Sequence, residues 1–126
     1  MNSNLRPLHR QLLGKTGEDY ATSYLRKKGY SILDRNFKAT YGEIDIIARI
    51  GDILVFIEVK TRIGRNFGLP EESVTPRKLR EIIKTSQYYV LKHPNLPEAQ
   101  RIDVIGIEYD VSGKVVYLNH IQNVTL

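Results

Sequence analysis

The chain has 126 residues, no cysteine, and 19 Lys and Arg against 14 Asp and Glu, which gives a net charge of +5. The absence of cysteine excludes disulfides, thiolate metal sites and cysteine nucleophiles, and the strongest apolar run, ILVFI at residues 53–57, is too short to span a bilayer. The basic charge favours a polyanionic partner. We expect a cytoplasmic protein without a membrane partner, because residues 1–10 carry no apolar signal segment.

The first half of the chain shows one helical pattern followed by three strand patterns. The predicted elements are a helix over residues 9–28, a strand over SILDRNF (31–37), a loop over KATY (38–41), and strands over EIDIIARI (43–50) and ILVFIEVKT (53–61). Only Gly51 and Asp52 separate the last two strands, which predicts a tight hairpin with glycine at the first turn position.

The second half begins with a loop, which is followed by a second helix and two further strands. It is predicted to hold a loop over IGRNFGLPEESV (63–74), a helix from Pro76 to the breaker HPNLP (93–97), and strands over RIDVIGIEY (101–109) and KVVYLNHIQ (114–122). Thr75 is the expected N-cap of this helix, and Pro76 suits its first position. The length fits a single core, so we expect one domain over residues 9–126 after a flexible N-terminus over residues 1–8.

The predicted hairpin register brings acidic side chains together. With Gly51 and Asp52 as the turn, Asp45 lies opposite Glu58, and Glu43 lies opposite Lys60, all on one face. Opposed side chains stand roughly 4.5 to 5.5 Å apart at Cβ, so two carboxylates there need a shared proton, a nearby cation or a bound metal ion.

Two interpretations of this cluster stay open. Lys60 can satisfy the carboxylates as a structural ion network, whereas clustered carboxylates without His or Cys are typical of a hard-cation site for Mg²⁺ or Mn²⁺. The register itself has one alternative, since a one-residue slip or a bulge would put Asp45 on the face opposite Glu58.

An acidic residue on one strand and Glu-x-Lys on the next resemble the PD-(D/E)XK nuclease superfamily. The chain more closely resembles the YraN family of small bacterial proteins, on the segments GKTGEDYA, RNFKATYGEIDIIA, VFIEVKTR, FGLPEESV and TPRK within residues 14–78. The resemblance implies an α/β fold with a restriction endonuclease-like core, in which helices flank a mixed central β-sheet. The superfamily's Pro-Asp doublet is absent, because Ile44 precedes Asp45.

The same resemblance implies a set of site residues and a cofactor. It assigns catalytic roles to Glu18, Asp45, Glu58 and Lys60, and a Mg²⁺ or Mn²⁺ ion to Glu18, Asp45, Glu58 and the backbone carbonyl of Val59. Lys60 would orient the attacking water or stabilise negative charge.

The placement of Glu18 has independent support from its neighbours in the sequence. Gly14, Gly17 and Ala21 flank it on its helical face, so the helix backbone could approach the hairpin closely. A glutamate that faces solvent or pairs with Lys15 or Thr22 is the alternative.

Basic residues follow the Glu-x-Lys strand and begin the second predicted helix. The expected nucleic-acid contacts are Arg62, Arg65, Arg77 and Lys78 on phosphates, and Tyr41 on an unpaired base. A solvated helix face is the alternative, because glutamates are interleaved with these cations.

Four further residues are weaker candidates. His9, His93 and His120 are too scattered in the sequence to form a metal cluster, and His120 is expected on a strand surface. Asp103 in RIDV is expected to pair with Arg101 or Lys114.

The resemblance implies a metal-dependent endonuclease that hydrolyses phosphodiester bonds in DNA, including branched or irregular structures, as the Holliday junction resolvases of the superfamily do. A non-catalytic nucleic-acid-binding module on the same scaffold and an RNA-directed nuclease are the alternatives. A homodimer is a further expectation, with the strands after Arg101 as its interface.

Overall fold

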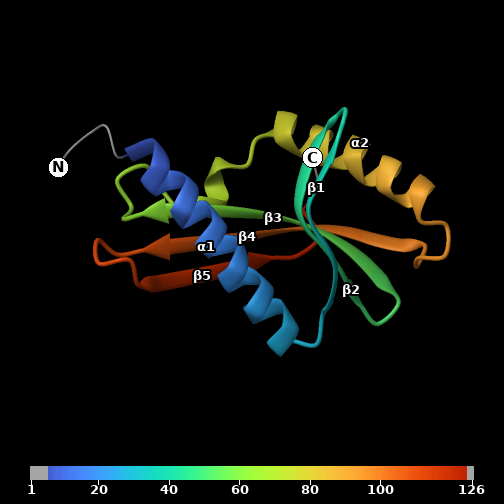
Figure 1. Ribbon diagram of the computed structural model, residues 1–126, viewed down its shortest axis with the longest axis horizontal. Helices are drawn as coiled ribbons and strands as arrows, with labels where there is room; N and C mark the ends of the chain where they lie inside the picture. Colours follow the sequence, from blue (N-terminus) through green and yellow to red (C-terminus); the bar gives the residue numbers. More distant parts are fainter. Residues whose placement is uncertain (1–5, 125–126) are drawn as a thin grey trace.

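The computed structural model describes residues 6–124, and within the first helix the side chains of residues 6–12 and 14 lie outside the described part. Five strands form one sheet, and α1 and α2 are its two long helices (Figure 1). The elements are α1 (Arg6–Lys27), β1 (Ser31–Ala39), β2 (Gly42–Ile50), β3 (Ile53–Ile63), the 3₁₀ helix η2 (Pro70–Ser73), α2 (Pro76–Lys92), β4 (Ala99–Tyr109) and β5 (Val115–Ile121). None of the described helices is long and apolar enough to cross a membrane.

The sheet is mixed, with the spatial order β1-β2-β3-β4-β5. Neighbouring strands are antiparallel except for β3 and β4, which run parallel. A parallel pair needs a crossover connection, and the segment that carries η2 and α2 supplies it. The predicted α/β fold with a mixed central sheet flanked by helices is therefore confirmed.

Strand side chains alternate between two core layers, one under each long helix. Val55 and Ile57 of β3 pack toward α1, in a cluster that contains Ala21 and Leu25. Leu54 and Phe56 point the other way, into a cluster that contains Leu79, Ile82 and Tyr89 of α2. This explains why residues 53–57 of β3 are apolar without a break, because both faces of this part of the strand are buried under helices.

The predicted turn and cap residues are in place. Gly51 has a φ of +55°, and Ile50 pairs with Ile53 across the turn. The Thr75 hydroxyl accepts a hydrogen bond from the backbone N–H of Lys78 at 3.1 Å, which caps α2 as predicted.

Two predicted boundaries differ from the structure. The first helix begins at Arg6 and not near residue 9, since Pro7 is compatible with the first turn, where no intrahelical N–H bond is lost. The flexible N-terminus predicted over residues 1–8 thus includes three helical residues, and residues 1–5 lie outside the described part. The loop predicted over residues 63–74 also contains η2.

Candidate active site

The hairpin ladder between β2 and β3 stops next to the predicted acidic pair. It runs from Ile50–Ile53 to Ile46–Ile57, and one further step of the same count places Asp45 opposite Glu58. At this step an Asp45 carboxylate oxygen accepts a hydrogen bond from the backbone N–H of Val59 at 2.8 Å. The Asp45 side chain therefore takes the place of a backbone partner, and the β2–β3 pairing ends here.

The predicted opposition of Glu43 and Lys60 is wrong for this reason. The β2–β3 ladder has ended before either residue, and Glu43 pairs instead with Lys38 of β1. Glu43 is exposed, so it stays outside the acidic pair.

Asp45 and Glu58 meet as predicted, and both are nearly closed to solvent, with 8% and 3% of their surface exposed. Burial raises the pKa of Glu58 well above its usual range, and Asp45 raises it further by accepting a hydrogen bond from the protonated form and by its charge. Without a bound metal ion, the two lysines do not fully offset the burial and the charge of the pair. Glu58 therefore readily holds a proton.

Two lysine ammonium groups approach the same Glu58 oxygen from different elements. Lys60 Nζ of β3 lies 3.8 Å from Glu58 Oε2, and Lys78 Nζ of α2 lies 3.6 Å from it. Both lower the pKa of Glu58, against the effects of burial and Asp45. Lys78, predicted only as a phosphate contact, thus lies at the acidic pair; the capped start in TPRK places it in the first turn of α2 but does not show that it reaches Glu58.

Glu18 comes to the site from α1 because the helix backbone touches β3. A β-carbon on Gly17 would lie 2.3 Å from Cγ2 of Thr61, so only glycine allows this approach. The predicted close contact is confirmed. The pKa of Glu18 is raised to about 7, chiefly by burial and then by the negative charges of Asp45 and Glu43, whereas Asn36 and Arg35 oppose the rise.

The alternative predicted for Glu18 is a side chain that faces solvent or pairs with Lys15 or Thr22. The Thr22 hydroxyl donates to the backbone carbonyl of Glu18 at 2.7 Å and not to its side chain. Arg35 lies 4.0 Å from the Glu18 carboxylate, and Asn36 donates a hydrogen bond to it.

Sequence reasoning missed Asn36 and Arg35. Asn36 has a φ of +52° and falls between the pairs Arg35–Ile46 and Phe37–Ile44, opposite Asp45 in the count. Asparagine tolerates this left-handed conformation better than most residues. An asparagine inside a strand pattern was the available signal for an irregular position.

The donors present suit a hard divalent cation only in part. No group of three or more His, Cys, Asp or Glu side chains that could hold a metal ion occurs among the described residues. Asp45 and Glu58 nevertheless offer oxygen donors alone, and Mg²⁺ is commonly held by one or two carboxylates with waters and substrate phosphates completing its shell. The pair fits such a site, whereas Glu18 does not close a three-carboxylate group with it.

Comparison with known proteins identifies the chain's relatives. A model of the family described as "Uncharacterised protein family UPF0102" matches residues 17–107. The chain belongs to this family. It is the YraN family of the sequence analysis, and the matched range contains all four residues predicted to be catalytic.

Bacterial UPF0102 proteins match over most of both chains. The protein of Persephonella marina is 48% identical over 94 residues, which are 75% of this chain and 81% of the relative. Those of Syntrophomonas wolfei and Geobacter metallireducens are 46% and 43% identical, covering 88% and 92% of this chain and 95% and 93% of the relatives. Among solved structures, Pyrococcus furiosus SfsA in complex with Ca²⁺ matches with a TM-score of 0.47 and 17% identity, over 89% of this chain and 64% of that chain, a likeness too low to support an inference about activity.

The three arginines predicted to contact phosphate in this UPF0102 protein differ in their exposure and in whether they already form an ion pair. Arg77 is well exposed, 3.9 Å from Glu81. Arg65 is already paired with Glu108 at 2.7 Å and lies over the Tyr117 ring. Arg62 is half-buried, and its Nε has no hydrogen-bond partner among the described residues.

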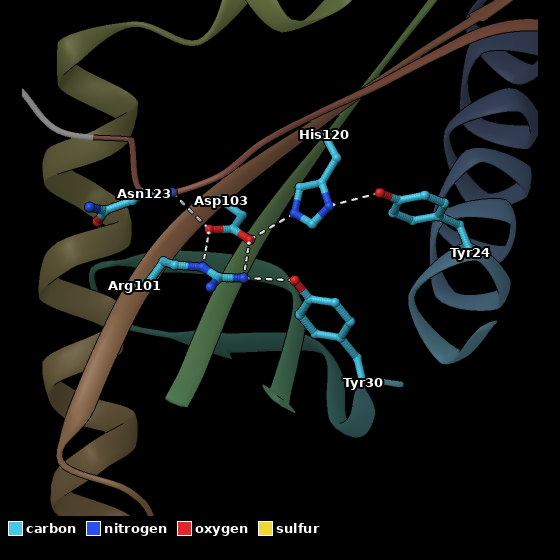
Figure 2. A network of polar contacts seen from close by, with 6 residues as sticks. All are labelled: Tyr24, Tyr30, Arg101, Asp103, His120 and Asn123. Atoms are coloured by element: carbon cyan, nitrogen blue, oxygen red, sulfur yellow. Dashed lines mark hydrogen bonds and ion pairs between the residues drawn. The ribbon is translucent and has the colours of Figure 1, made fainter. Parts of the chain in front are cut away.

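A second polar cluster lies on the side of the sheet that α1 covers (Figure 2). Its members are Tyr24, Tyr30, Arg101, Asp103, His120 and Asn123. Asp103 is fully buried and accepts two hydrogen bonds from Arg101, at 2.9 and 3.1 Å, and lies 2.7 Å from the His120 ring. The predicted pairing of Asp103 with Arg101 is confirmed.

The expectation that His120 is a strand surface residue is wrong. Its side chain is 6% exposed, and its other ring nitrogen lies 3.0 Å from the Tyr24 hydroxyl of α1. The cluster therefore ties α1 to β4 and β5. It supports the helix that carries Glu18.

Proposed function

We propose that this UPF0102 protein is a metal-dependent endonuclease that hydrolyses phosphodiester bonds in DNA. The observation that carries the proposal is the meeting of two buried carboxyl groups, Asp45 and Glu58, where the β2–β3 ladder ends, with two lysines within 4 Å of Glu58. A mixed sheet flanked by helices is also the architecture that the resemblance to PD-(D/E)XK nucleases implies.

Asp45 and Glu58 would hold a Mg²⁺ or Mn²⁺ ion, with the Val59 carbonyl as a further oxygen donor and with waters and substrate phosphates completing the shell. When bound, such an ion polarises the scissile phosphate and makes a water molecule more acidic. The Val59 N–H fixes Asp45 at 2.8 Å, so this carboxylate is oriented by the backbone of the strand that carries Glu58. A fixed carboxylate loses little entropy when it binds a ligand.

Glu58 must lose its proton before it can bind a cation. Because its pKa is raised to about 8, cation binding at neutral pH releases a proton from the protein. Metal affinity should therefore increase as the pH rises through this range.

Lys60 is the group placed to act on the substrate. It is on the same strand face as Glu58 and keeps about a third of its side chain exposed, so its ammonium can reach a phosphate oxygen or an attacking water. A fixed positive charge beside a transferring phosphoryl group stabilises the negative charge of the transition state. Lys78 adds a second cation on the α2 side.

Mn²⁺ binding and DNA cleavage test this proposal together. Calorimetric titration with Mn²⁺ at neutral pH is expected to show binding to the wild type and none to Asp45→Ala, and a screen of branched, flapped and single-stranded DNA should show cleavage that Lys60→Ala abolishes. Asp52→Asn is the matched control, because Asp52 is a fully exposed acidic side chain at the hairpin turn.

Two results would replace the proposal with its alternatives. DNA binding without Mn²⁺ binding or cleavage would make the protein a non-catalytic nucleic-acid-binding module. Cleavage of RNA alone would make it an RNA-directed nuclease, since nothing in the acidic pair distinguishes the two sugars.

A further inference from the structure

A cleft of about 420 Å³ lies between the turn after β1 and the outer face of α2. Its lining residues are Tyr41, Lys84, Gln87, Tyr88 and Leu91. The turn rests on the middle of α2, since a β-carbon on Gly42 would lie within 3.6 Å of both Glu81 and Thr85 (Figure 1). The cleft therefore joins two elements that are distant in sequence.

Two tyrosines present their rings to this cleft. Tyr41 is 56% exposed, and Tyr88 is 37% exposed. Phe37 of β1 stacks on the Tyr88 ring, with centroids 6.2 Å apart and planes 30° apart, so the core holds that ring in place. Exposed rings that are backed by the core are suited to stack on a flat ligand.

Lysine ammonium groups lie over the same two rings. Lys84 Nζ is 5.9 Å from the Tyr41 centroid, and Lys92 Nζ is 5.4 Å from the Tyr88 centroid. Both distances are near the outer limit of a cation–π contact. Such weakly held groups can move aside for a flat ligand and bind anionic groups attached to it.

A nucleobase with its flanking phosphates matches these features. Aromatic faces stack on any base, ammonium groups bind phosphates, and the Gln87 amide can both donate and accept hydrogen bonds at a base edge. The lining of the cleft contains no acidic residue. We propose that this cleft binds an unpaired base of a single-stranded nucleic-acid segment.

The position of the cleft connects it to the acidic pair. Lys78, at Glu58, and Tyr88 are ten residues apart on α2, which is about 15 Å along a helix. Arg77 lies just before Lys78, and Arg80 and Lys84 lie between Lys78 and Tyr88; all three are exposed and recur at helical spacing, so phosphates have contacts along the way. A strand with a base in the cleft would therefore lead along α2 to Glu58.

The inference that the substrate has a single-stranded segment beside the scissile bond rests on the proposed function, whereas the base-binding cleft does not. A paired and stacked base in a duplex cannot offer its face to Tyr41 or Tyr88. Flapped, branched or single-stranded DNA meets this requirement, and an intact duplex does not.

Binding without metal tests the cleft separately from catalysis. A fluorescently labelled DNA single strand and the matching duplex are titrated with the wild-type protein, Tyr41→Leu and Tyr88→Leu in EDTA, with anisotropy as the readout. The wild type should prefer the single strand, and each leucine variant should bind it roughly 5- to 150-fold more weakly, the range for losing one base–aromatic stack. A 2-aminopurine base in the strand should be quenched by the wild type and by Tyr88→Phe, which keeps the ring.

Tyr20→Leu is the matched control, because it removes an exposed tyrosine on α1 and should leave affinity unchanged. Lys84→Gln should lower the slope of log affinity against log salt by about 0.7, as for one phosphate contact on a single strand. Equal affinity of the two leucine variants and the wild type, equal binding of duplex and single strand, or no binding at all would overturn the inference. Cleavage that persists in the leucine variants with unchanged affinity would leave the proposed function standing without the cleft, and tyrosine-dependent binding without cleavage would do the reverse.

Discussion

Gly17 of α1 lies against Thr61 of β3 so closely that a β-carbon at Gly17 would be 2.3 Å from Thr61 Cγ2. Glu18 is the next residue on the helix, and Lys60 is the neighbour of Thr61 on the strand. This one contact therefore sets the distance between the parts of the site that come from α1 and from β3.

Gly17→Ala should destabilise the protein, although alanine is the better helix former. The new methyl group forces α1 away from β3, and overpacking of this kind costs about 1 to 3 kcal/mol. Urea unfolding measures the loss. Thr61→Ser removes the atom in conflict, so the double variant should recover part of the stability, whereas Ser23→Ala on the exposed face of α1 should not destabilise. Additive losses in the double variant would show that the contact is not the cause.

Replacement of Asp103 should reduce stability strongly. Burial alone would raise the pKa of Asp103, but hydrogen bonds from His120, Arg101 and Asn123 lower it below 3.8. The stabilisation is therefore present above the unfolded-state pKa and is lost as pH falls through the lower folded-state value. Asp103→Asn leaves Arg101 without its charged partner and should cost about 3 kcal/mol or more at neutral pH, measured by urea unfolding.

The exposed ion pair between Arg49 and Asp52 provides the comparison for Asp103. Asp52→Asn should change stability by about 0 to 1 kcal/mol. If Asp103→Asn were equally mild, the buried cluster would not hold α1 on the sheet.

The sequence could predict the β2–β3 hairpin because a two-residue turn with glycine first fixes both turn and register. Alternation then brought Asp45 to Glu58 correctly. The same counting failed two residues further on, at Glu43 and Lys60. The reason is that the end of the ladder depends on a hydrogen bond that the Val59 backbone N–H donates to the Asp45 carboxylate, which no strand periodicity encodes.

Lys78 and His120 show a second limit of sequence-based prediction. Thr75 and Pro76 fixed the start of α2, but which side chain of its first turn reaches Glu58 depends on how the helix lies on the sheet. β5 is partly buried on both faces, so alternation gave no signal for the face on which His120 lies. Tertiary packing decided both positions.

Metal-free protein should become less stable as pH rises from about 5 to 8. Glu58 has its folded-state pKa raised, so between its unfolded and folded values the native state holds more protons than the unfolded state, and stability falls by up to about 1.4 kcal/mol per pH unit. Glu18 acts in the same direction, with a folded-state pKa of about 7. Thermal unfolding in EDTA across this range measures the slope. Glu58→Gln should flatten it, and an unchanged slope in that variant would assign the pH dependence to other groups.

Lys78→Gln should shift Mn²⁺ binding to higher pH. Lys78 lies 3.6 Å from Glu58 Oε2 and lowers the pKa of this carboxyl, so its removal makes Glu58 harder to ionise and harder to bring to a cation. Calorimetric titrations with Mn²⁺ at several pH values would show the midpoint of binding moving upward, and activity at neutral pH should fall about tenfold, which corresponds to about 1.4 kcal/mol. Lys114→Gln, an exposed lysine in the β4–β5 turn, should leave both unchanged. If the pH midpoint of Mn²⁺ binding were the same as in the wild type while cleavage was still reduced, Lys78 would act on the substrate phosphate and not on Glu58.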